Sequence, residues 1–182
     1  MILRDEAFGT LQEDAFRRDF SVNALYFDPN SKEIIDYVNG LADLAKRRIR
    51  LIGEPAVRLA EDPVRILRAV RFANKLNFTL DEDIVDLIED SAARLQAIPP
   101  ARLFDEFLKL FLNGNGEAIW QQIRHTGIAR ALFPTCNPNS DLVVAAMRNT
   151  DERIKSGLSV TPGFLIAVLL WEDFAARAAE AV

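Results

Sequence analysis

Apolar residues recur at helical spacing along most of the chain, most clearly between residues 62 and 76. Ile66, Ala69, Val70 and Ala73 fall on one side of a helix that turns by about 100° per residue. The other side carries charged residues and one aromatic ring, at Glu61, Arg65, Arg68, Phe72 and Lys75. Asp62 can cap the first free N–H groups, and Pro63 suits the first turn. The pattern predicts a helix with one buried face and one charged face.

The same periodicity continues beyond Gly53 with no intervening strand signal. Predicted helices cover residues 54–59, 62–76, 81–93, 100–112, 115–126, 140–156 and 161–178. Proline, glycine and asparagine clusters separate them, as at Ile98-Pro-Pro and Asn113-Gly-Asn-Gly. The second and larger part of the chain is therefore predicted to be all-α.

The first part of the chain has a different pattern. Residues 20–27, 33–38 and 48–52 are short runs rich in β-branched and aromatic residues, and they predict two or three strands. Because two or three strands do not make a stable sheet by themselves, we expect that the chain begins inside an α/β domain. The predicted fold is mainly α, with three regions: an α/β remnant at 1–52, a helical neck at 53–112 and a helical body at 113–182.

Composition restricts the compartment. Of the 182 residues, 49% are hydrophobic, which is enough for a core. The single cysteine, Cys136, excludes an internal disulfide and a cysteine-based zinc site, which favours the reducing cytoplasm. No apolar run approaches the ~18 residues of a membrane helix, and the residues after Met1 are charged rather than signal-like. We expect a cytoplasmic protein without a membrane contact.

Charge is unevenly distributed. Residues 46–75 contain nine basic and three acidic residues, a net charge of +6 within a chain of net charge −5. A local basic site in an acidic protein fits a nucleotide or an RNA end better than a long duplex. A solvated face of helical ion pairs such as Glu61–Arg65 is the alternative interpretation of the same spacing.

Three blocks in order resemble a known family. They are Asp14-Ala-Phe-Arg-Arg-Asp-Phe-Ser-Val-Asn-Ala-Leu25, Asp36-Tyr-Val-Asn-Gly-Leu-Ala-Asp-Leu44 and the stretch Arg58–Phe78, which contains Glu61-Asp-Pro-Val-Arg65. They resemble motifs B, C and D of the class II nucleotidyltransferases, which comprise CCA-adding enzymes and bacterial poly(A) polymerases. The downstream segments 98–111, 127–134 and 149–154 are more similar to the poly(A) polymerase branch. Three ordered motifs are a far more specific signal than any one of them.

The resemblance implies a phosphoryl-transfer site in the first part of the chain. Asp19 would be a catalytic carboxylate and a ligand of Mg²⁺, together with an Asp-x-Asp block that this sequence lacks. Arg17 and Arg18 would hold the triphosphate of ATP, and Asn23 would contact the nucleotide. An ion pair of Asp19 with Arg17 or Arg18 is the structural alternative.

The resemblance also implies a base-recognition site in the third block. Glu61, Asp62 and Arg65 would present acceptors and donors to the base, and Arg68 adds a further guanidinium. For Asp62 the alternative is helix capping, which competes with base reading. The one Asp-x-Asp of the chain, Asp81-Glu82-Asp83, lies at a predicted helix start and is interpreted as a cap rather than a metal site.

Other conspicuous residues receive structural interpretations. In the second block, Asp36, Asn39, Gly40 and Asp43 predict a loop scaffold. Arg102, Glu106 and Lys109 share a helical face and predict a polar network that braces the neck. The aromatic residues are predicted to pack in the core, among them Phe104, Phe107, Phe111, Trp120 and Trp171.

Together these features predict part of a polynucleotide adenylyltransferase that adds AMP from ATP to an RNA 3′ end. We expect a fragment without the catalytic block and without a basic C-terminal region, inactive alone. A CCA-adding tRNA nucleotidyltransferase and a non-catalytic helical module that binds RNA or protein are the alternatives. Uncovered strands at 20–52 also predict self-association.

Overall fold

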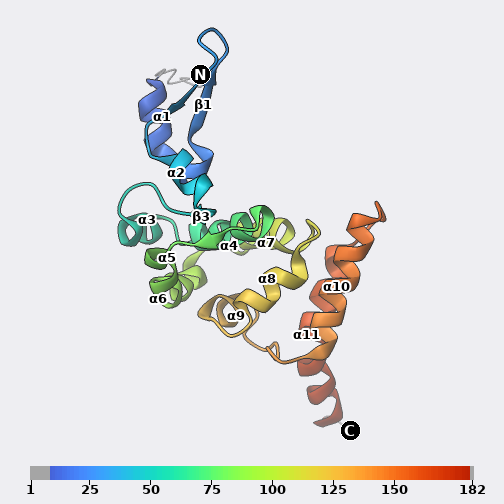
Figure 1. The fold of residues 1–182 in the computed structure, drawn as a ribbon. Coiled ribbons are helices and arrows are strands. Elements are labelled where there is room, and N and C mark those ends of the chain that lie inside the picture. The colour runs from blue at the N-terminus through green and yellow to red at the C-terminus, as the bar shows by residue number, and fades with distance from the viewer. Residues whose placement is uncertain (1–8, 181–182) are drawn as a thin grey trace, which may run out of the picture.

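The computed structural model describes residues 9–180 and forms an elongated molecule (Figure 1). The charged residues 1–8, on which the expectation of no export signal partly rests, lie outside the described range. A small N-terminal part stands on a layer of helices, and the two last helices lie beside that layer at the C-terminal end. The prediction of a mainly helical fold with a small α/β part is confirmed.

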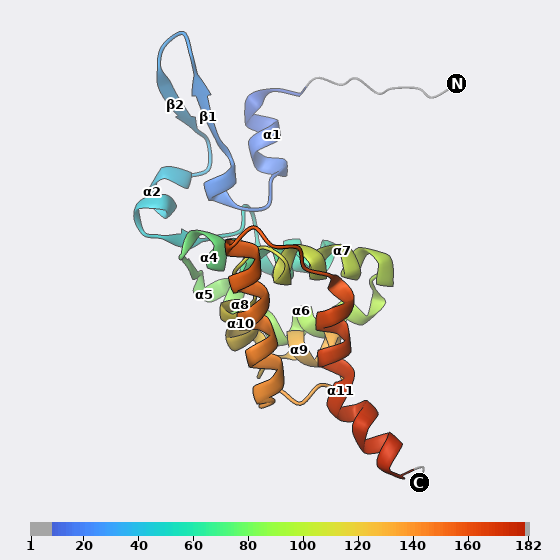
Figure 2. The ribbon, with the colours of Figure 1, turned by 90° about the vertical axis from the view of Figure 1, so that its right-hand side faces the viewer.

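The N-terminal part contains one short helix, a hairpin and a second short helix. Helix α1 (Leu11–Arg17) begins with a capping box in which Thr10 and Glu13 bond each other's backbone. A 3₁₀ turn, η1 (Ser21–Asn23), leads into the antiparallel strands β1 (Leu25–Asp28) and β2 (Glu33–Asp36), and α2 (Gly40–Ala45) follows. Figure 2 shows the hairpin projecting away from the helical layer.

The N-terminal part joins the helices through a parallel strand pair. Strand β3 (Arg48–Ile49) pairs with β4 (Thr79–Leu80), which directly follows helix α4. An isolated bridge joins Phe20 to Leu51, and Ile52 donates a backbone hydrogen bond to Asp19. The segment that carries Asp19 is thereby fixed to the base of the helical layer.

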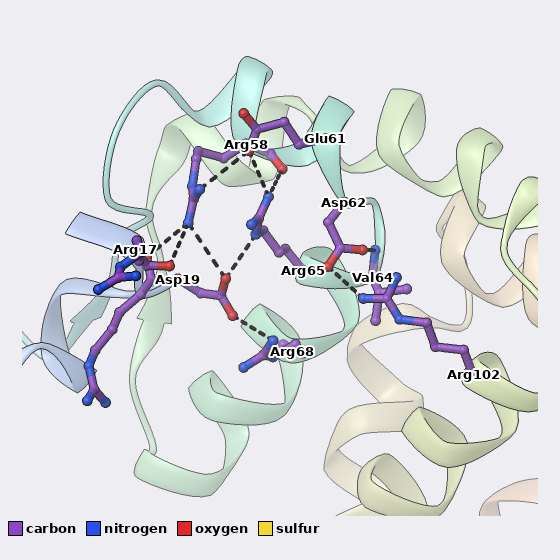
Figure 3. A network of polar contacts seen from close by, with 10 residues as sticks. Arg17, Asp19, Arg58, Glu61, Asp62, Val64, Arg65, Arg68 and Arg102 are labelled. Atoms are coloured by element: carbon purple, nitrogen blue, oxygen red, sulfur yellow. Dashed lines mark hydrogen bonds and ion pairs between the residues drawn. The ribbon is translucent and has the colours of Figure 1, made fainter. Parts of the chain in front are cut away.

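Helix α4 (Val64–Leu76) is the centre of the hydrophobic core. All four predicted apolar positions, Ile66, Ala69, Val70 and Ala73, are buried, so the prediction for this helix is confirmed. Neighbouring helices pack on it or on one another, namely α3 (Pro55–Glu61), α5 (Glu82–Asp86), α6 (Ile88–Arg94), η2 (Leu95–Ala97), α7 (Pro100–Phe111), α8 (Gly116–Ile123) and α9 (Gly127–Leu132). Arg65 and Arg68 of α4 point toward Asp19 in the N-terminal part (Figure 3).

Helices α10 (Asp141–Lys155) and α11 (Pro162–Glu180) complete the described chain. Asp151 of α10 is buried and accepts the backbone N–H groups of Gly116 and Glu117, so it caps α8 from another helix. Helix α11 buries only Leu165 and Leu169. No helix in residues 9–180 combines the length and hydrophobicity needed to cross a bilayer.

Several predicted elements are wrong in detail. No helix was predicted where α1 lies, and residues 79–80 form a strand, although Asp81 caps α5 as expected. The predicted helix at 81–93 is two helices, and α9 was not predicted. Phe104 and Trp171 are 43% and 53% exposed rather than in the core, because the outer faces of α7 and α11 lack a covering element within the described chain.

Candidate functional site

Asp19 lies where the N-terminal part meets helices α3 and α4, and it accepts ion pairs from the charged face of α4. Its Oδ1 lies 2.9 Å from Arg65 Nε, and its Oδ2 lies 2.8 Å from Arg68 Nη1. Arg58 Nη2 lies 3.9 Å from Oδ1. Figure 3 shows these three arginines converging on the carboxylate, whose side chain is 10% exposed. Glu61 also pairs with Arg58 and Arg65, so three guanidinium groups face two carboxylates and the centre keeps a net positive charge, which suits an anion.

Asp19 does not pair with Arg17 or Arg18, so the structural alternative for this residue is wrong. Both arginines turn back along α1. Arg18 bonds Asp14 one turn earlier at 2.9 Å and lies over the ring of Tyr26, while Arg17 donates to the backbone of its own helix. These local partners are available because residues 11–17 are helical. The structure therefore does not place the Arg17 and Arg18 side chains beside Arg65.

Arg58 is a further member of the cluster, and the sequence pattern gave it no role in nucleotide binding. Its Nη2 donates to the backbone carbonyls of Arg17 and Arg18 at 3.3 and 3.0 Å, and its Nη1 lies 3.4 Å from Glu61 Oε2. Arg58 lies three residues before Glu61 and seven before Arg65, and this spacing was the sequence signal that could have placed it in the cluster. The link to Arg17 and Arg18 spans about forty residues and depends on the tertiary fold.

Glu61 and Arg65 present the exposed edge of the cluster. Arg65 Nη1 lies 3.2 Å from Glu61 Oε2 and 2.6 Å from the carbonyl of Arg58. The Arg65 side chain is 14% exposed, whereas that of Glu61 is 53% exposed. The carboxylate of Glu61 is therefore the part of this pair that a ligand reaches first, and Arg65 stands behind it.

Asp62 is a helix cap and an ion-pair partner. Its Oδ1 accepts the N–H of Val64 at 3.2 Å, at the start of α4, and its Oδ2 accepts Arg102 Nη2 of α7 at 2.6 Å (Figure 3). The capping role given as the alternative for Asp62 is present in this structure, and base reading by Asp62 stays a prediction. Arg102 thus braces α7 against the start of α4, whereas Lys109 lies 2.8 Å from the buried Glu106 within α7. The predicted single network of Arg102, Glu106 and Lys109 is therefore present only in part.

Asn23 lies in η1, and its carbonyl accepts Arg18 Nη1 at 3.3 Å. This contact ties η1 to the end of α1. It places the backbone of Asn23 next to one of the two arginines that were predicted to bind the triphosphate.

The second block forms the predicted scaffold beneath Asp19. Asp36 accepts the N–H groups of Val38, Gly40 and Leu41, while Asn39 adopts a left-handed conformation with a φ of 62°. Burial alone would raise the pKa of Asp36, but these backbone donors together hold that pKa below its ordinary value. Gly40 has no room for a Cβ, which would collide with the carbonyl of Ser21.

Asp43 completes this scaffold. It is 2% exposed and accepts hydrogen bonds from Ser21 Oγ, Arg48 and Arg50 at 2.6 to 2.8 Å. Burial acts to raise its pKa, yet these three partners outweigh burial and lower it. Arg48 also lies 2.9 Å from Asp81, so the network connects the segment after Asp19 to the first turn of α5.

Potential metal ligands are not clustered in the described residues. No group of three or more His, Cys, Asp or Glu side chains in residues 9–180 is arranged to hold a metal, and that includes Asp81-Glu82-Asp83. Both oxygens of Asp19 already accept guanidinium groups, which compete with a cation. The Mg²⁺ role predicted for Asp19 therefore requires carboxylates that the described residues do not supply.

Comparisons with known proteins agree with this architecture. Residues 3–50 match the poly A polymerase head domain, and residues 77–139 match the probable RNA and SrmB-binding site of polymerase A; together they cover more than half of the chain. Poly(A) polymerase I of Salmonella typhi is 45% identical in an alignment 180 residues long that covers 94% of this chain and 39% of that protein. The chain thus spans about two fifths of the length of this relative.

CCA-adding enzymes are also similar. The enzyme of Streptococcus gordonii is 46% identical over 103 residues, which are 57% of this chain and 26% of that protein. A solved tRNA nucleotidyltransferase complexed with a primer tRNA and an incoming ATP analogue superimposes with a TM-score of 0.72 at 28% identity, covering 89% of this chain and 50% of the other. The chain belongs to the nucleotidyltransferase family of poly(A) polymerases and CCA-adding enzymes.

Proposed function

We propose that this chain is the nucleotide-binding part of a polynucleotide adenylyltransferase, which transfers AMP from ATP to the 3′ end of an RNA. The reaction joins the RNA 3′ oxygen to the α-phosphorus, breaks the bond between that phosphorus and the β-phosphate, and releases pyrophosphate. The carrying observation is the cationic cluster of Arg58, Arg65 and Arg68 around Asp19, with the exposed carboxylate of Glu61 at its edge.

The triphosphate would be bound by Arg17 and Arg18. The Arg18–Asp14 pair is about 45% exposed on both sides, and such surface pairs are weak. A triphosphate offers several negative charges where Asp14 offers one, so it can take over Arg18, and Arg17 holds only a 3.3 Å bond to its own helix. Asn23, whose carbonyl contacts Arg18, would border the ribose or phosphate.

The base would be read by Glu61 with Arg65 behind it. A carboxylate accepts hydrogen bonds from the exocyclic amino group of adenine, and Arg65 is fixed in place by Asp19. Arg68, at 37% exposure, is available to a phosphate on the other side of Asp19. Asp62 would brace the start of α4 and would not contact the base, because both of its oxygens have partners.

The proposal extends to cofactor, partner and compartment. Mg²⁺ would act in the complete enzyme if further carboxylates join Asp19, RNA would enter with its 3′ end at the cluster, and the cytoplasm would be the compartment. The hairpin also exposes Phe27 and Ile34 at 63% and 53%, which is the basis for proposing self-association of this chain. Sedimentation that gives a monomer at high concentration would refute that last point.

The alternative function is CCA addition. Similarity to poly(A) polymerase I extends along nearly the whole chain, whereas the CCA-adding match covers 57% of it, which favours adenylation. A chimaera tests this choice: the chain replaces the matching segment of the Salmonella typhi enzyme and receives an oligoribonucleotide with ATP or CTP separately. We expect long adenylate tails from ATP and little product from CTP. Efficient incorporation of C would contradict the proposal and favour CCA addition.

A further inference from the structure

We propose that Arg58 is a positioning residue for triphosphate binding. It fixes the backbone that carries Arg17 and Arg18 against the helix end that carries Glu61. The inference rests on the proposed function, since it concerns the same nucleotide site. Arg58 begins the third sequence block and belongs to the cationic cluster, and the inference adds its role in holding the backbone of Arg17 and Arg18.

The geometry of Arg58 joins two parts of the fold. One terminal nitrogen, Nη2, donates to the carbonyl of Arg17 at 3.3 Å and to that of Arg18 at 3.0 Å. The other, Nη1, lies 3.4 Å from Glu61 Oε2 on the last turn of its own helix, α3. Asp19 is farther away, at 3.9 Å. The shortest side-chain contacts of Arg58 are therefore with main-chain oxygens of the segment that would bind the triphosphate.

The carbonyls that Arg58 reaches are those at the C-terminal end of α1. Such carbonyls lack an intrahelical donor and carry partial negative charge. A guanidinium group suits this place because its planar fork donates in fixed directions to several acceptors, which an ammonium group cannot reproduce. The side chain is 17% exposed, and its Nε is buried without a hydrogen-bond partner among the described residues. The terminal nitrogens thus determine its orientation.

Without Arg58, the Arg17–Arg18 backbone loses the two hydrogen bonds that join it to α3. Two guanidinium groups that converge on a triphosphate must be held at a fixed separation, so freeing their backbone weakens phosphate binding. The adenine contact depends on Glu61 and Arg65, and Arg65 keeps its own bond to Asp19. Loss of Arg58 should therefore weaken binding of ATP much more than binding of adenosine.

The test is isothermal titration calorimetry of the chain with ATP and, separately, with adenosine. Arg58→Met removes the donors and keeps the length of the side chain, and Arg58→Lys keeps the charge without the fork. Arg94→Ala, at an exposed arginine in the last turn of α6, is the matched control. Thermal melting checks that each variant folds, and Arg58→Lys decides the question if Arg58→Met shows no folded baseline.

We expect the Kd for ATP to rise about tenfold in both Arg58 variants, which corresponds to one charge-assisted hydrogen bond. The Kd for adenosine should stay within about twofold of the wild-type value, and Arg94→Ala should change neither. If folded Arg58 variants bind ATP with wild-type affinity, the inference about Arg58 is wrong while the proposed function stands. The same holds if the affinities for ATP and adenosine fall equally. Absence of ATP binding by the wild-type chain would instead refute the proposed function on which the inference rests.

Discussion

Replacing Asp19 by asparagine should destabilise the chain substantially, because it leaves Arg58, Arg65 and Arg68 without their shared negative partner. Breaking a buried ion pair by removing one partner costs about 3–5 kcal/mol. The amide oxygen of asparagine still accepts one hydrogen bond, and Arg68 is 37% exposed and thus screened by solvent. Both facts reduce the expected loss to about 2–3 kcal/mol.

Thermal unfolding followed by circular dichroism measures this loss. For a chain of this size, 1 kcal/mol corresponds to about 2–4 °C, so Asp19→Asn should lower the Tm by about 4–12 °C. Asp173→Asn is the control, because Asp173 forms an i,i+4 pair with Arg177, whose side chain is 71% exposed. That pair should contribute under about 0.5 kcal/mol. Equal Tm values for Asp19→Asn and the wild type would refute the organising role given to Asp19.

Three further predictions concern the scaffold and the thiol. The pKa of Asp43 lies below its ordinary value of 3.8, because hydrogen bonds from Ser21 and two arginines outweigh burial. Its contribution to the free energy of unfolding should be complete above pH 3.8 and disappear as the pH falls through the folded-state pKa. In urea denaturation the wild type should therefore lose more stability on acidification than Asp43→Asn. Gly40→Ala should cost about 1–3 kcal/mol in urea denaturation, since its Cβ would meet backbone, whereas Gly163→Ala, with nothing within 4 Å, should be nearly neutral. Burial raises the pKa of Cys136 to about 11, so its reaction with a disulfide reagent at pH 8 should be far slower than that of free cysteine, and an equal rate would contradict this.

The sequence was sufficient to predict the elements with strong periodicity. The apolar face of α4, the cap at Asp81 and the scaffold loop around Gly40 were all identified because each depends on local pattern or turn chemistry. Helix α1 was missed since it is seven residues long and buries only Ala15. Its capping box at Thr10 and Glu13 was the signal that could have revealed it.

The partners of the charged side chains could not be predicted from spacing. Asp19 has Arg17 and Arg18 beside it in the sequence, yet it pairs with arginines about 45 residues away, such as Arg65. The fold brings these distant side chains closer than the adjacent ones. The parallel pairing of β3 with β4 was also not predictable from the sequence, because each strand is only two residues long and shows no alternating pattern. Long-range pairing of this kind depends on how α4 packs, which no local signal specifies.

The assignment of the cationic cluster to nucleotide binding is tested most directly by titrating ATP into the wild-type chain and into Arg65→Ala. Arg65 joins Glu61 to Asp19. We predict saturable binding by the wild type and at least a tenfold weaker affinity for the variant, the effect of about one charge-assisted contact. Equal affinity in the two proteins, or no binding by either, would contradict the account.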